Sequence, residues 1–147
     1  IAVESKQLAT LQALLANGVE PVGANAPVAE AGKTLVFEAV DTGEAEYVEV
    51  LTQAGADAKT ANEYGVPPLA EAARVGNLPM CKALIAAGAD PNHTPGGFPL
   101  LFGPVVEGHL DIVRFLIEKG AKLGDSKQDL LEAAKSDQMK ALLSANE

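Results

Sequence analysis

The chain has few of the residues that usually build reactive sites. Its 147 residues include one cysteine, two histidines and no tryptophan, and only 4% of them are aromatic. A single cysteine, Cys81, excludes a disulfide within the chain and a zinc site made of cysteines alone. Neither histidine has a second histidine or a cysteine at ligand spacing, and no nucleophile, base and orienting group can be assembled. We therefore predict no catalytic residue, no cofactor and no metal, and we expect that the chain is not an enzyme.

Positive charge is also scarce. The sequence has 11 Lys and Arg residues against 20 Asp and Glu residues, which gives a formal net charge of −9. Phosphate backbones and anionic lipid surfaces repel such a chain, so we expect neither a nucleic acid nor a membrane as its partner. No run approaches the roughly 18 apolar residues of a membrane span. The charge favours a basic segment of another protein as the partner, and nothing in the sequence indicates the compartment.

What the chain does contain is a repeat. An apolar stretch that ends in glycine occupies residues 6–18, 43–55, 76–88 and 108–120, and the final glycines are separated by 37, 33 and 32 residues. Apolar residues recur within each copy at intervals of three or four, which predicts an amphipathic helix that the glycine ends in a left-handed conformation. One apolar column of these helices is Leu14, Leu51, Leu84 and Leu116, and another includes Cys81, which is therefore predicted to be a core thiol.

A second unit precedes each of the last three copies. The segments TLVFEAVDTG (34–43), PPLAEAARVG (67–76) and PLLFGPVVEG (99–108) align without gaps. Each places an apolar residue and then a small residue three positions later on one face, which predicts a short inner helix that neighbouring helices can approach closely.

Together the two units resemble the ankyrin repeat. The resemblance rests on GVPPLAEAARVGN, AGADPN and EGHLDIVRFLIEKGA, and it covers essentially the whole chain. It implies an all-α solenoid of stacked helix–turn–helix units with hairpin-like finger loops, forming a single domain over residues 1–147 and a monomer. The expected units are a partial first repeat (1–18), repeats at about 32–57, 65–90 and 97–121, and a C-terminal capping repeat at about 127–146.

The chain departs from the family pattern at several positions. The family's histidine after the leucine is replaced by Phe37, Ala70 and Phe102, so we expect packing to hold those turns. The first repeat begins inside its inner helix, so we expect at least one turn of structure to be missing upstream of Ile1 or to be replaced by a terminal cap. His109 occupies the family's position at the start of a helix. Whether Asn92, at a position that is hydroxylated in some ankyrin repeats, is modified stays open.

The resemblance also implies where a partner would bind. Ankyrin repeats bind proteins on a concave face made of finger residues and the outward residues of the inner helices. We expect Tyr64 and Phe98 to anchor a partner, although each ring could instead pack against a neighbouring finger. Residues 20–71 hold ten acids and two lysines, and Glu38 and Glu71 should form a carboxylate ladder that steers a basic segment. The residues predicted to form this face are Glu30, Lys33, Glu38, Asp41, Glu63, Tyr64, Val66, Glu71, Arg74, His93, Thr94, Phe98 and Val106.

The alternative is a small-molecule, nucleotide-binding or enzymatic role carried by the long loop at residues 19–33. Within it, PVAEAGKT (27–34) falls one residue short of the phosphate-binding pattern because Pro27 replaces the first glycine. Gly32, Lys33 and Thr34 also align with the ordinary turn of the repeat, so we favour a turn over a phosphate site.

Overall fold

The computed structural model describes residues 35–146, and these residues form four helix–turn–helix pairs. The two helices of each pair are joined by two or three residues. No strand occurs between residues 35 and 146, so the predicted all-α solenoid is confirmed. The pairs are α2 (Leu35–Thr42) with α3 (Ala45–Gln53), α4 (Pro68–Arg74) with α5 (Leu78–Ala86), α6 (Phe102–Glu107) with α7 (Leu110–Glu118), and α8 (Lys127–Ala133) with α9 (Asp137–Ser144).

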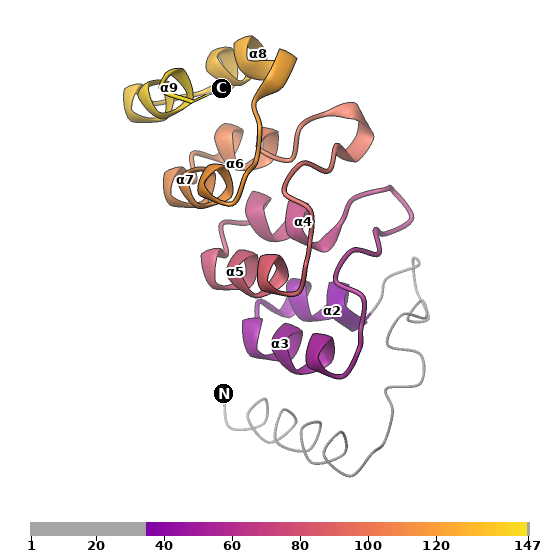
Figure 1. Cartoon of the computed structure of the whole chain (residues 1–147). Coiled ribbons are helices and arrows are strands. Elements are labelled where there is room, and N and C mark those ends of the chain that lie inside the picture. The colour runs from indigo at the N-terminus through magenta and orange to yellow at the C-terminus, as the bar shows by residue number, and fades with distance from the viewer. Residues whose placement is uncertain (1–34, 147) are drawn as a thin grey trace.

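The pairs stack into two columns of helices (Figure 1). The inner column holds α2, α4, α6 and α8, and the outer column holds α3, α5, α7 and α9. Each helix contacts its own partner and the neighbouring helix of its column. The repeat boundaries and the single-domain assignment stay predictions, and the helix pairs lie inside the intervals expected for them.

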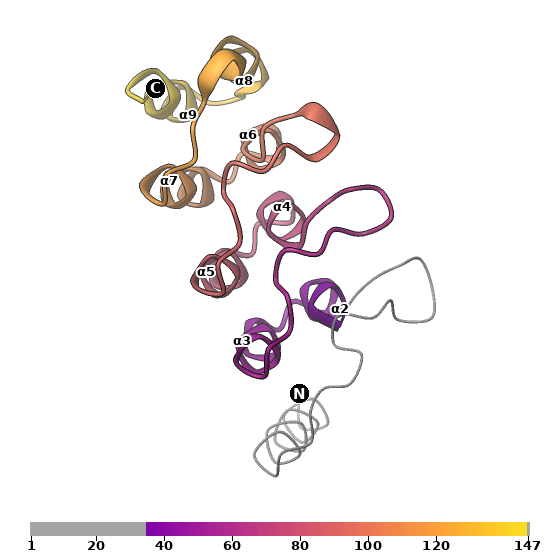
Figure 2. The same cartoon turned by 45° about the vertical axis from the view of Figure 1, so that its right-hand side comes forward.

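Two long connections leave the stack on the side of the inner column (Figure 2). We call residues 54–67, between α3 and α4, the first finger, and residues 87–101, between α5 and α6, the second finger. The second finger contains a 3₁₀ turn, η1 (Pro95–Gly97), and a shorter connection with the turn η2 (Gly124–Ser126) leads to α8.

The core follows the columns that the sequence predicts. Leu51, Leu84 and Leu116 are buried at equivalent positions of α3, α5 and α7, and Cys81 is completely buried beside them. Leu14, the first member of the leucine column, lies outside the described residues. Each repeat therefore buries its apolar face only against its neighbours, as a solenoid requires.

Polar side chains bridge successive repeats at the short turns. The Asn77 side chain donates to the Gly43 carbonyl at 3.0 Å and accepts from the Met80 amide, so it caps α5 and reaches the preceding repeat. At the next turn, His109 Nε2 lies 3.0 Å from the Arg74 carbonyl. A carbonyl only accepts, so this nitrogen carries the proton. His109 does occupy the start of α7, as expected, and it also ties α7 to the preceding repeat.

A second kind of bridge joins the second finger to the following connection. The side-chain nitrogen of Asn92 donates to the Gly120 carbonyl at 3.0 Å, and the main-chain amide of Lys122 donates to the side-chain oxygen of Asn92 at 2.9 Å. We call this pair of bonds the Asn92 clasp. It spans roughly 30 residues of sequence and closes the junction between two repeats.

Removing the clasp should loosen that junction. Asn92→Ala deletes two hydrogen bonds at an exposed position, so we expect the free energy of unfolding to fall by about 1 kcal/mol. Urea denaturation followed by circular dichroism measures the change. Lys122→Ala is the matched control because it removes a side chain and keeps the amide, and an equal loss in both variants would contradict the assignment.

Candidate functional site

Eleven of the thirteen residues predicted for the binding face lie within the described part of the chain, and we call these eleven the candidate face. Glu30 and Lys33 lie outside the described residues, and so does the whole phosphate-like segment 27–34. The inner helices carry Glu38, Asp41, Glu71, Arg74 and Val106, and the fingers carry Glu63, Tyr64, Val66, His93, Thr94 and Phe98. All are exposed except Val66, Glu71 and Val106, which are half-buried.

The first finger holds Tyr64 in the open. The side-chain oxygen of Asn62 accepts from the main-chain amides of Tyr64 and Val66, both at 3.0 Å. The main-chain amide of Asn62 donates to the Val66 carbonyl. Hydrogen bonds within the finger therefore hold this turn, and the expectation that packing replaces the family's histidine between neighbouring turns stays a prediction. The Tyr64 side chain is 76% exposed. The pKa of the Tyr64 hydroxyl is raised, mainly by a hydrogen bond with the Glu63 carboxylate and secondly by the negative charge of that carboxylate.

The second finger presents Phe98 differently. Gly96 and Gly97 both take positive φ angles at its tip, a conformation that glycine adopts without a steric penalty. Phe98 follows them and is 59% exposed. Its ring centroid lies 5.3 Å from that of Phe102 on α6, with the planes tilted by 36°. One side of Phe98 thus packs on the inner helix of its own repeat rather than on a neighbouring finger, and the rest of the ring faces solvent.

Within the predicted ladder of Glu38 and Glu71, which stays a prediction, Glu71 has a partner on its own helix. Two nitrogens of Arg74 donate to the two carboxylate oxygens of Glu71, at 2.6 and 3.0 Å. Glu71, and then Glu107, raise the pKa of Arg74. The third position of the Glu38 and Glu71 column is Gly103, where a Cβ would lie 3.3 Å from the Arg74 Cβ. The negative charge of Glu71 is therefore compensated locally, and a pairing at this i,i+3 spacing could have been anticipated from the sequence.

Acidic residues are concentrated one repeat earlier. Residues 35–58, which contain α2 and α3, have six carboxylates and neither lysine nor arginine. Glu38 and Asp41 belong to this segment and lie on the candidate face. Counted over residues 35–146, the formal charge of the candidate face is therefore most negative at its α2 end.

Sequence reasoning missed one exposed apolar residue near the face. Val75 directly follows α4, and its side chain is 50% exposed. It aligns with Thr42 and Glu107, which are polar, so the repeat alignment already indicated that this position is exposed. With Tyr64 and Phe98 it completes the set of large apolar side chains that are exposed between residues 35 and 146.

Neither a cluster of metal ligands nor a reactive thiol is found among the described residues. No three His, Cys, Asp or Glu side chains between residues 35 and 146 come together as a metal site would require. Burial raises the pKa of the Cys81 thiol to about 12, so the thiol stays protonated at neutral pH and is a poor nucleophile. Over the same residues, no helix has the length and apolar character needed to cross a bilayer.

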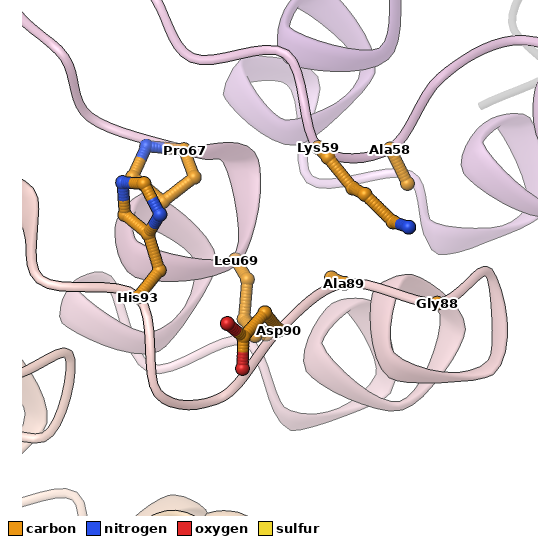
Figure 3. A pocket seen from close by; sticks show the side chains of 8 residues that line it. All are labelled: Ala58, Lys59, Pro67, Leu69, Gly88, Ala89, Asp90 and His93. Atoms are coloured by element: carbon orange, nitrogen blue, oxygen red, sulfur yellow. The ribbon is translucent and has the colours of Figure 1, made fainter.

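Two open clefts lie where the fingers leave the helices. The larger, of about 340 Å³, lies between the first and second fingers and is lined by residues that include Lys59, Leu69, Asp90 and His93 (Figure 3). The other, of about 280 Å³, lies one repeat further along and includes Asn92 and Lys122. Both clefts are open to solvent rather than enclosed.

Comparison with known proteins supports the repeat assignment. A family profile described as ankyrin repeats in three copies matches residues 1–95. The ankyrin repeat protein nuc-2 of Neurospora crassa is 38% identical over 73 residues, which is 48% of this chain and 7% of that protein. The match thus spans a small part of a much longer relative.

Proposed function

Because the chain belongs to the ankyrin repeat family, we propose that it binds another protein on the candidate face and has no catalytic activity of its own. Ankyrin repeats are generally protein–protein interaction modules. The observation that carries the proposal is the exposure of Tyr64 and Phe98, at 76% and 59%, on the two successive fingers. Aromatic side chains dominate the energetics of protein interfaces, and an exposed ring at a finger has the most apolar area left to bury.

Charge supports a partner with a basic segment. Glu38 and Asp41 place acidic residues at the α2 end of the candidate face, and residues 35–58 as a whole have six carboxylates with no lysine or arginine among them. Complementary charge mainly accelerates encounter, whereas a buried aromatic anchor mainly slows dissociation. The two classes of residue therefore have separate kinetic signatures.

The anchor can be tested on a partner recovered by affinity capture on the immobilised chain. Tyr64→Ala should speed dissociation and weaken binding by about 2 kcal/mol or more, as expected of a central interface aromatic. Surface plasmon resonance measures both rate constants. Lys82→Ala, an exposed change on the outer helix α5, is the control. Unchanged dissociation from Tyr64→Ala would exclude Tyr64 as the anchor.

The steering charge is tested by reversing it at one exposed position. Glu38→Lys should slow association, and the difference should shrink as salt is raised because screening acts over about 10 Å at 0.1 M salt. Glu118→Lys makes the same charge change at the end of the outer helix α7. Equal slowing by both variants would show a response to net charge rather than to the candidate face.

A further inference from the structure

The junction between the two fingers lacks the clasp that closes the next junction. At that next junction, the Asn92 amide group bonds to the main chain of Gly120 and Lys122. The repeat alignment AGADAK (54–59), AGADPN (87–92) and KGAKLG (119–124) places Lys59 at the position of Asn92. It likewise places Gly88 and Asp90 at the positions of Gly120 and Lys122.

The main-chain amides of Lys59 and Asn92 make the same local hydrogen bond to the aspartate two residues earlier. The Lys59 amide donates to the Asp57 carboxylate at 2.9 Å, and the Asn92 amide donates to the Asp90 carboxylate at 2.8 Å. The Lys59 side chain also leads toward the equivalent place, because a Cβ on Gly88 would lie 3.7 Å from the Lys59 Cε. The two side chains thus start beside equivalent aspartates and run toward equivalent glycines of the following repeat.

An ammonium group cannot replace the carboxamide in this role. Lysine has donors only, so it cannot accept from the Asp90 amide as Asn92 accepts from the Lys122 amide. Within residues 35–146, the Gly88 carbonyl and the Asp90 amide make no hydrogen bond, and Lys59 makes no ion pair. A main-chain donor and a main-chain acceptor, set at the spacing that holds Asn92 one repeat later, are therefore left open to water.

These groups line the larger cleft. Figure 3 shows Lys59 on the side of the first finger, and Asp90 and His93 on the side of the second. The cleft volume of about 340 Å³ is on the order of ten times the roughly 30 Å³ that one water molecule occupies in the liquid. It has room for a side chain.

We propose that the Gly88 carbonyl and the Asp90 main-chain amide bind a carboxamide side chain, asparagine or glutamine, of a partner protein. The carboxamide oxygen would accept from the Asp90 amide, and its nitrogen would donate to the Gly88 carbonyl, as the Asn92 group does within the chain. Lys59 adds a second donor for the same oxygen. A carboxylate would face the Gly88 carbonyl and the Asp90 carboxylate, so a neutral group with both a donor and an acceptor fits better.

The inference rests on the proposed function only in that the carboxamide belongs to a protein. Its test therefore uses a small probe. We would titrate N-acetyl-asparagine N-methylamide into the ¹⁵N-labelled chain and follow the amide resonances, with the leucine and aspartate counterparts as matched probes. The asparagine probe should shift the Asp90 amide saturably, and the leucine probe should leave it in place. No shift with asparagine, an equal shift with leucine, or tighter binding of aspartate would overturn the proposal.

Two variants separate the main-chain groups from the ammonium. Lys59→Asn supplies the missing carboxamide from within the chain, so it should abolish the response to the probe, slow hydrogen exchange of the Asp90 amide and raise the Tm. Lys59→Met keeps the main-chain pair open and should retain the response at lower affinity. A response that persists in Lys59→Asn, or disappears in Lys59→Met, would contradict the assignment. Binding of a partner through Tyr64 and Glu38 is measured separately, so failure here leaves the proposed function standing.

Discussion

Replacing Leu84 with alanine is expected to lower the free energy of unfolding by about 2–5 kcal/mol, because the change opens a cavity in the core. Leu84 is completely buried on α5, and α5 packs against both α3 and α7. The cavity would therefore lie between the central repeats, where each unit depends on its neighbours. Urea denaturation monitored by circular dichroism measures the loss.

The matched control lies on the same helix. Lys82→Ala changes an exposed side chain of α5, and surface substitutions of this kind usually alter stability by less than about 0.5 kcal/mol. A Leu84→Ala protein as stable as the Lys82→Ala protein would show that the leucine column is not the core of the stack.

The second large effect is expected at Gly76. Its φ angle is +86°, and a Cβ there would lie 2.6 Å from the His109 imidazole. Gly76→Ala must therefore adopt a left-handed conformation and also displace the ring that reaches the Arg74 carbonyl. We expect a loss of about 2–4 kcal/mol, which combines backbone strain with the lost bridge.

Gly108 provides a control with the same backbone and no neighbour. Its φ angle is also +86°, but a Cβ would meet nothing within 4 Å. Gly108→Ala should therefore lose only the backbone part, about 1–2 kcal/mol. In the double variant Gly76→Ala with His109→Ala the clash disappears. The loss of stability in the double variant should therefore be smaller than the sum of the losses in the two single variants. Equal losses at Gly76 and Gly108 would mean that the imidazole contact contributes nothing.

The sequence predicts the helices and the core because both depend on local periodicity. The glycines that end the three described copies, and the column of Leu51, Leu84 and Leu116, follow from spacing alone, and the structure confirms them. The exposure of Tyr64 and Phe98 was also anticipated, since both lie at turns with little core to join.

The sequence does not predict contacts that join distant segments. The Asn92 clasp and the His109 bridge span about 30 residues, and their partners are main-chain groups that any residue type carries. Only the alignment of repeats, read together with the structure, shows that Lys59 lacks what Asn92 has. The Glu71 and Arg74 pair is the opposite case, because its i,i+3 spacing was visible from the start.

The position of the partner on the stack tests the proposal most directly. A photoreactive benzoylphenylalanine would replace Tyr64 in one variant and Lys82 in another, and each would be irradiated with the recovered partner. We expect a covalent product from position 64, on the first finger, and none from position 82, on the outer helix. A product from position 82 alone would place the partner on the outer helices and contradict the account.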